Sequence, residues 1–113
     1  MRWTLKRAPV SWATRVEGAA ILGASVAAYW VLEASWGMFW LFLLAPDVCF
    51  VAYASGKRVG AMAYNLAHTL AGPLLLGGMA MVVAERGMAL AALIWLAHIG
   101  VDRALGFGLK PLP

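Results

Sequence analysis

The stretch His98-Ile99-Gly100-Val101-Asp102-Arg103 closes a long apolar run near the end of the chain. His98 and Asp102 are four residues apart, so on a helix they lie one above the other on a single face. The run that leads to them is apolar enough to be a membrane span, and ionisable side chains at that depth need partners. The sequence therefore predicts a helix bundle built around a polar site inside a membrane.

The composition agrees with a membrane protein. Of the 113 residues, 64% are hydrophobic, well above the roughly 45–50% of a soluble domain. The net charge of +4 comes from basic residues that flank apolar runs, where they set topology and contact anionic lipid, so no nucleic-acid partner is expected. The single cysteine, Cys49, lies in an apolar run and is interpreted as a small buried hydrophobe.

Four apolar runs predict an all-α fold, a polytopic membrane helix bundle with four transmembrane helices. The spans are expected at about residues 18–33, 36–54, 59–84 and 88–106, within one transmembrane domain over residues 18–113. Residues 1–17 are basic and aromatic and predict a short N-terminal interfacial segment at the headgroup level. Pro46 and Asp47 interrupt the second span, and Gly72-Pro73 permits a kink in the third.

The basic residues also predict the topology. Four spans put both termini on one side of the membrane, and eight of the nine Lys and Arg residues fall on that side: Arg2, Lys6, Arg7, Arg15, Lys57, Arg58, Arg103 and Lys110. Only Arg86 lies opposite. The positive-inside rule then makes the N- and C-termini cytoplasmic. A three-span alternative, with residues 18–54 as one broken hairpin or re-entrant element, would divide the charges less cleanly.

Polar side chains from three of the expected spans fall in one layer. Counting 1.5 Å per residue from the cytoplasmic end of each span puts five of them at depths of roughly 8–14 Å: Asp47, Asn65, His68, His98 and Asp102. Tyr64 and Asn65 stand four and three residues before His68, so the three can share one helix face. The layer is therefore predicted to form one polar site that faces the cytoplasm.

Two carboxylates and two imidazoles in such a layer are a ligand set for a divalent cation. The predicted metal ligands are Asp47, His68, His98 and Asp102. Oxygen and nitrogen ligands suit zinc, manganese or ferrous iron, and such an ion can assist hydrolysis. The candidates for orienting these ligands or binding substrate are Tyr64, Asn65 and Arg103.

The same layer has two other interpretations. In a structural one, Arg103 pairs with Asp102 or Asp47, and each histidine bonds a backbone carbonyl freed by a proline. In the other, two histidines at matched depth clamp a haem. Haem is not expected, because it does not call for two carboxylates in the same layer.

At these residues the sequence resembles a known family. The matching segments are Pro46-Asp47-Val48, Tyr64-Asn65 followed by His68, and the closing run HIGxDRALGFGLK that begins at His98. They are similar to a family of small bacterial four-helix membrane proteins known only as a domain of unknown function. The resemblance spans about residues 18–110. It implies a multi-pass protein of the bacterial inner membrane and no assigned activity.

A more remote similarity is to bacterial membrane-bound metal-dependent hydrolases. Their pattern is a Pro-Asp pair, a later His, and a His-x-x-x-Asp on a following helix. That likeness implies a site made of Asp47, His68, His98 and Asp102, with catalytic roles for Asp47, His98 and Asp102. The chain departs from the pattern at two places. Cys49 and Phe50 stand where those proteins carry a second Asp and a His, and Ala63 and Tyr64 replace a His-Arg pair.

Two functions remain open from the sequence. One is metal-assisted hydrolysis of a lipid or another membrane-derived substrate at a cytoplasm-facing His/Asp site. The alternative is a non-enzymatic small membrane subunit packed against a larger membrane complex or in a homo-oligomer, with the His/Asp layer structural and the abundant Gly and Ala serving lateral packing. The lipid bilayer is a partner in both.

Overall fold

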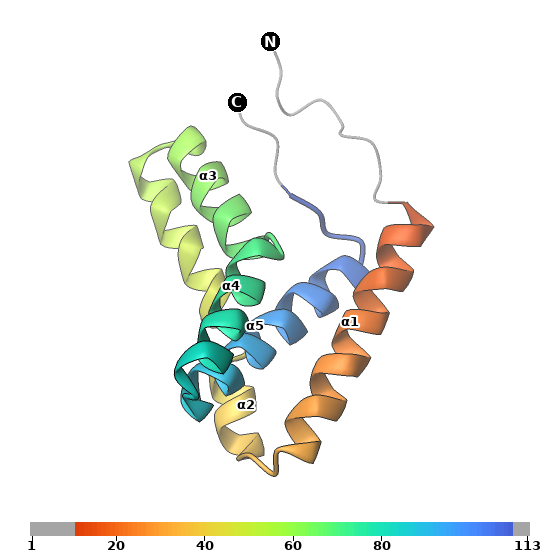
Figure 1. Ribbon diagram of the computed structural model, residues 1–113. Coiled ribbons are helices and arrows are strands. Elements are labelled where there is room, and N and C mark those ends of the chain that lie inside the picture. Colours follow the sequence, from red (N-terminus) through yellow and green to blue (C-terminus); the bar gives the residue numbers. More distant parts are fainter. Residues whose placement is uncertain (1–10, 110–113) are drawn as a thin grey trace.

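The computed structural model describes residues 11–109, and within that range every regular element is helical (Figure 1). The elements are α1 (Trp12–Val31), α2 (Trp36–Phe42), the 3-10 helix η1 (Ala45–Ser55), α3 (Lys57–His68), α4 (Ala71–Val83) and α5 (Arg86–Ala104). The prediction of an all-α fold is confirmed. Of the expected interfacial segment, residues 1–10 lie outside the described residues.

Two or three membrane spans are supported, not four. Among residues 11–109, the helical stretches Trp36–Ser55 and Arg86–Ala104 are long and apolar enough to cross a membrane, and α3 with α4 forms a third span if this pair, bent by 44°, is counted as one. Helix α1 is not among them. It carries Arg15 and Glu17 in its first turns, together with two Trp residues and several Gly and Ser residues, all of which lower its mean hydropathy.

Helix α1 runs without interruption across the boundary expected at residue 17. Ser11 begins the helix, because its side-chain oxygen accepts a hydrogen bond from the backbone N–H of Thr14 at 3.1 Å. Gly18 does not break it, since this glycine is the point where α5 packs closely. A Cβ there would lie 2.6 Å from the backbone nitrogen of Ala104. An interfacial helix separate from a first span is therefore not seen in the described residues.

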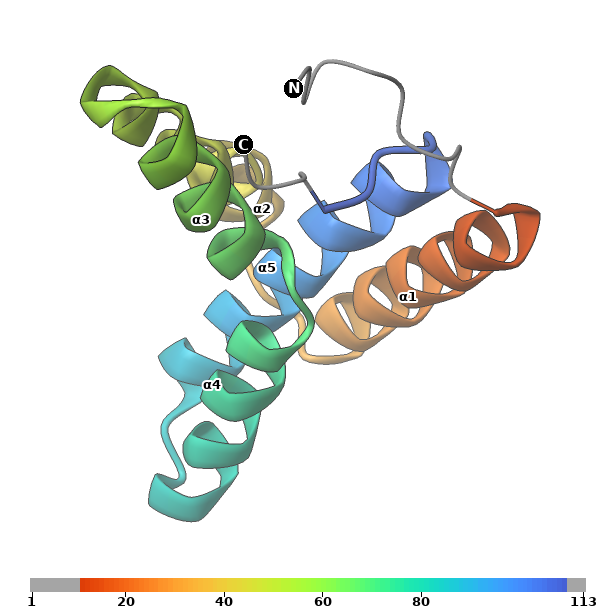
Figure 2. The same ribbon diagram turned by 90° about the horizontal axis from the view of Figure 1, so that it is seen from above.

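Helix α5 is the central element, with α1 on one side and α3 and α4 on the other in both views (Figures 1 and 2). Helices α1 and α5 are antiparallel, and an arginine joins them at each end. Arg15 Nε donates to the carbonyl of Ala104 at 3.1 Å, and Arg86 donates to the carbonyl of Leu32 at 2.6 Å. The start of α1 and the end of α5 thus lie at the same end of the molecule. The buried hydrophobic cluster joins α1, α2 and α5: Tyr29, Phe39, Leu90, Ile94 and Ala97.

The third expected span is two helices. Helix α3 ends at His68, and Thr69 has extended backbone angles (φ −85°, ψ 154°). Pro73 is the third residue of α4, where its missing N–H costs little, whereas a continuous helix would bring its ring against the carbonyl of Thr69. The kink expected at Gly72-Pro73 is therefore a break at Thr69-Leu70.

Trp95 of α5 satisfies part of the broken helix. The last carbonyls of a helix have no partner within it, and Trp95 Nε1 donates to one of them, that of Ala67, at 2.6 Å.

We expect Trp95→Phe to lower the free energy of unfolding by about 1–3 kcal/mol, because it leaves this part-buried acceptor unpaired. Thermal unfolding in detergent measures the loss. Trp40→Phe, at an exposed position of α2, is the control, and an equal loss in both variants would contradict the assignment.

Candidate metal centre

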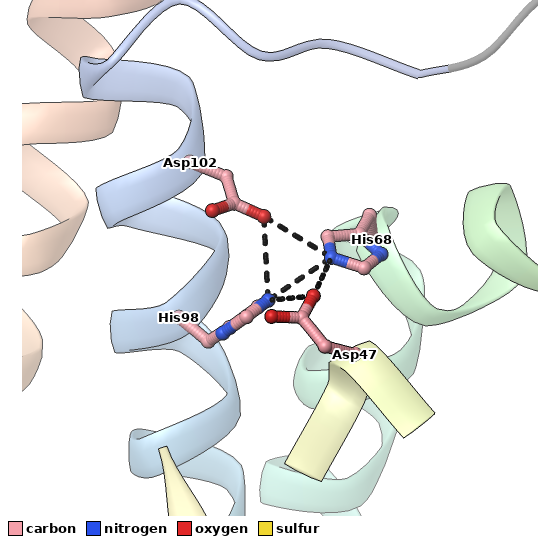
Figure 3. A group of neighbouring side chains, drawn as sticks. All are labelled: Asp47, His68, His98 and Asp102. Carbon is pink, nitrogen blue, oxygen red and sulfur yellow. Dashed lines mark hydrogen bonds and ion pairs between the residues drawn. The ribbon is translucent and has the colours of Figure 1, made fainter. Parts of the chain in front are cut away.

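Four ionisable side chains from three helices converge on one point (Figure 3). Nε2 of His68 lies 3.0 Å from Nε2 of His98 and 3.1 Å from Oδ2 of Asp102. Asp47 Oδ1 lies 3.5 Å from Nε2 of His68 and 3.2 Å from Nε2 of His98, which is 3.3 Å from Asp102 Oδ2. One donor atom from each residue thus lies within 4.8 Å of all the others. The structure brings together the four residues that the sequence predicts as metal ligands.

A match between two kinds of helix brings Asp47 opposite His68. In a 3-10 helix, residues three apart are eclipsed and separated by about 6 Å along the axis, the rise of four residues in an α-helix. Residues of η1 and α3 spaced in these two ways therefore pair in register. The ring of Tyr53 fills the space where a Cβ of Gly60 would lie, Phe50 and Tyr64 have ring centroids 5.5 Å apart, and Asp47 meets His68.

Pro46 explains where the 3-10 winding begins. Helix α2 ends at Phe42, and Pro46 is the second residue of η1, where the backbone loses a hydrogen-bond donor. The sequence predicts an interruption of the second span at Pro46-Asp47, and the change of helix type confirms its place. The 3-10 winding makes every third residue of η1 face α3. A kinked α-helix, which is what the proline predicts, would not have this register.

The ring of His68 is held so that Nε2 faces the cluster. Its Nδ1 lies 2.9 Å from the carbonyl oxygen of Tyr64, and because a carbonyl only accepts, the proton is on Nδ1. The Tyr64 ring stacks on the His68 ring, with centroids 3.9 Å apart and planes 9° apart. The ring of His98 also hydrogen-bonds backbone, at Leu43. Nδ1 bonding to a carbonyl is the usual arrangement of a histidine that binds metal through Nε2.

The donor atoms have the spacing of a metal coordination shell. A tetrahedral ion with bonds of about 2.0–2.1 Å has ligand atoms about 3.3–3.4 Å apart. Five of the six separations run from 3.0 to 3.5 Å, and all six are within 4.8 Å. In a neutral histidine with Nδ1 protonated, Nε2 is only an acceptor, as is a carboxylate, so the cluster needs a positive charge at its centre, from a metal or from additional protons.

The four side chains of the cluster are buried to different extents, so only one side of the cluster is accessible. Both histidine side chains are 4% exposed, whereas Asp102 is 21% and Asp47 is 39% exposed. A molecule that approaches the cluster therefore meets Asp47 first. The two Nε2 atoms are too close for the imidazoles to lie on opposite faces of a haem.

The predicted substrate-binding residues divide into two groups. Tyr64 and Arg103 line a small pocket together with His68 and Asp102, whereas Asn65 is half-buried on α3 and is not part of that lining. Across residues 11–109, the ion pairs of Asp47 and Asp102 are with the histidines and not with Arg103. The structural interpretation that paired Arg103 with an aspartate is wrong for these residues.

Sequence reasoning missed Gly60, Phe50 and Leu43. Gly60 stands four residues before Tyr64, and this spacing could have extended the α3 face by one turn. Phe50 follows Asp47 by three residues, a signal that is informative only once the 3-10 winding is known. Leu43 stands three residues before Pro46, so its carbonyl is one that a proline frees in a 3-10 helix, as the structural interpretation expected for a histidine partner without naming the residue.

A family described as Domain of unknown function (DUF4260) has a model that matches residues 11–112 of the chain. No curated protein and no solved structure matches. The expected resemblance to an uncharacterised family is confirmed, whereas the resemblance to metal-dependent hydrolases is not shown by these comparisons.

Proposed function

The chain belongs to the family described as Domain of unknown function (DUF4260), and we propose that it is a membrane-bound, metal-assisted hydrolase of a lipid or another membrane-derived substrate. Its metal ligands are Asp47, His68, His98 and Asp102. The observation that carries the proposal is the spacing of their donor atoms, which matches the coordination shell of a small divalent ion. Zinc, manganese and ferrous iron all accept this mixture of nitrogen and oxygen ligands.

The exposed carboxylate has the position of a general base. A divalent ion in the cluster would supply an activated water and polarise a phosphoryl or carbonyl oxygen. Asp47 is the most exposed of the four side chains and the one nearest to an arriving substrate. It would therefore take the proton of the attacking water, which would need a fifth position on the ion, while His98 and Asp102, one turn apart on α5, would hold the ion in place.

Arg103 and Tyr64 have different roles in this proposal. Arg103 lines the small pocket beside Asp102, and its guanidinium would bind a phosphate or carboxylate of a substrate that reaches this side of the cluster. Tyr64 acts through His68, whose ring it covers and whose Nδ1 proton its carbonyl accepts. Tyr64 is therefore a positioning residue.

The membrane supplies the substrate in this proposal. Asp47 lies on the stretch Trp36–Ser55, and His98 and Asp102 lie on Arg86–Ala104, the two stretches that are each long and apolar enough to cross a membrane. We place the protein in a bacterial inner membrane with both termini in the cytoplasm. The shared end of α1 and α5 and the excess of Lys and Arg residues on that side support this topology.

Asp47→Asn tests the catalytic assignment. We expect it to reduce kcat by about 10²-fold or more, the usual contribution of a general base, for hydrolysis of p-nitrophenyl phosphates and esters that carry short and long alkyl chains. The enzyme is assayed as purified, after treatment with EDTA, and after reloading with zinc, manganese or iron. Glu17→Gln removes an exposed carboxylate of α1 and is the matched control. Activity that survives both EDTA and Asp47→Asn would refute the proposal.

A second candidate is a non-enzymatic subunit of a larger membrane complex or a homo-oligomer. The closed set of four protein ligands favours it, because catalytic zinc sites usually keep one position for water. Large apolar side chains exposed along α4 would then pack laterally: Leu74, Leu75, Met79, Met81 and Val82. In this case Asp47→Asn impairs assembly, no hydrolysis depends on it, and partners co-purify in constant stoichiometry.

A further inference from the structure

An apolar groove lies beside the His/Asp cluster formed by Asp47, His68, His98 and Asp102. Its cavity volume is about 440 Å³, within the range of about 300–1,000 Å³ that is typical of small-molecule sites. All of its lining side chains are apolar, and they come from both sides of the fold: Met38 and Phe42 of α2, Pro46 of η1, and Ala91, Ile94 and Trp95 of α5 among them. No residue proposed to bind metal or to act on substrate contributes to this lining.

The groove continues the face of α5 that carries two of the metal ligands. Toward the start of α5, Asp102, His98 and Ile94 succeed one another at intervals of four residues. Ala91 comes three residues before Ile94, so all four lie on one face of the helix. Ile94 is about 6 Å along the helix from His98. On the opposite wall, Pro46 directly precedes Asp47. One end of the groove therefore adjoins the cluster.

Its lining residues all belong to segments that can lie within a membrane. They come from Trp36–Ser55, from Arg86–Ala104 and, through Leu76, from α4 of the bent pair. Lipid chains are thinner than helices and are the apolar molecules that surround these segments.

We propose that the groove binds one alkyl chain of an amphiphilic substrate, whose polar headgroup reaches the metal cluster. This inference rests on the proposed function, which makes the cluster the reacting end. It narrows the substrate class to molecules with an alkyl chain attached to a hydrolysable ester or phosphate. The direction of α5 then sets their orientation, with the chain toward Ala91 and the headgroup toward His98 and Asp102.

Photolabelling in vesicles tests the chain site without requiring activity. The probes are phosphatidic acid and phosphatidylcholine, each with a diazirine near the end of one acyl chain, in vesicles of unlabelled phosphatidylcholine. Mass spectrometry of peptides locates the adducts. We expect adducts on residues 36–46 and 87–95 to exceed those on Leu75 and Met79, which are exposed on α4 and do not line the groove.

Ala91→Trp is the blocking variant. Ala91 is exposed and lines the groove, so a larger side chain can fill the groove without entering the core. We expect this variant to lower labelling of the groove to the level of the α4 side chains. Ala27→Trp, at an exposed alanine of α1, is the matched control and should leave labelling unchanged. Equal labelling of groove and α4 in the wild type would overturn the inference. So would unchanged labelling in Ala91→Trp, or a change of oligomer size in that variant with no loss of adducts.

His98→Ala separates this inference from the proposed function. We expect the wild type to label more with phosphatidic acid than with phosphatidylcholine. His98→Ala should lose this preference but keep its phosphatidylcholine adducts in the groove, because His98 does not line the groove. If the wild type labels the groove but shows no preference between headgroups and no metal, the proposed function fails while the alkyl-chain site stands. If bound metal and hydrolysis are found but the groove is not labelled, the alkyl-chain site is refuted and the proposed function stands.

Discussion

Protein purified in detergent without chelators is expected to retain close to one equivalent of zinc, manganese or iron, and His98→Ala is expected to retain none. The substitution removes one of four ligands and leaves Asp47 and Asp102 facing each other around a vacated position. Loss of a group that only orients a ligand lowers metal affinity about 10–100-fold, so loss of the ligand itself should lower it by more. Mass spectrometry of the metal content measures the outcome.

Matched variants show whether the loss is specific. His68→Ala should lose the metal as His98→Ala does, because its Nε2 has an equivalent place in the cluster. Glu17→Gln and Cys49→Ala remove a carboxylate and a thiol outside the cluster and should keep the metal. A His98→Ala protein that retains one full equivalent of metal would disprove the assignment of His98 as a metal ligand. Metal absent from the wild type as well would favour the structural subunit.

Replacement of Gly100 by alanine is expected to weaken the contact between α1 and α5 strongly. A Cβ at Gly100 would lie 2.7 Å from the backbone nitrogen of Leu22 and 2.8 Å from the backbone oxygen of Gly18. These are main-chain atoms of α1 and cannot rotate away, so the two helices must move apart. We expect a loss of about 1–3 kcal/mol in the free energy of unfolding, measured by thermal unfolding in detergent.

Gly23→Ala on α1 provides a control of opposite sign. Nothing lies within 4 Å of a Cβ at Gly23, so this substitution only removes the entropic cost of a glycine inside a helix and should stabilise the protein by about 0.5–1 kcal/mol. If both variants shift the unfolding midpoint in the same direction, the close approach of the helices at Gly100 does not limit stability.

The candidate site could be predicted from the sequence because its members follow α-helical spacing or stand beside a proline. His98 and Asp102 are one turn apart, as are Tyr64 and His68, and both pairs share a face in the structure. Asp47 follows the proline at which the second span changes its winding. Membrane depth then placed these residues in one layer, since polar side chains in an apolar segment are drawn to one another.

The remaining features depend on contacts between distant segments, which periodicity does not contain. The 3-10 winding of η1 is stable here because its every third residue meets every fourth residue of α3, with the Tyr53 ring against Gly60 and Phe50 against Tyr64. The continuity of α1 past residue 17 likewise depends on α5, which packs on Gly18. The fourth span is not confirmed, because the range 18–33 leaves out the charged first turns of α1, which lower the mean hydropathy of the whole helix.

The pairing of α1 with α5 has a consequence for how the protein is made. The ribosome synthesises α1 first and its main partner last, and at about 5–20 residues per second the end of α5 emerges about 4–15 s after the end of α1. During that interval the face around Gly18 lies uncovered, on a helix that is not apolar enough to be counted as a span by itself. Assembly is therefore complete only when Arg15 reaches the carbonyl of Ala104. Truncated or stalled chains that end before α5 are left with an N-terminal helix that lacks its partner, with the surface around Gly18 uncovered.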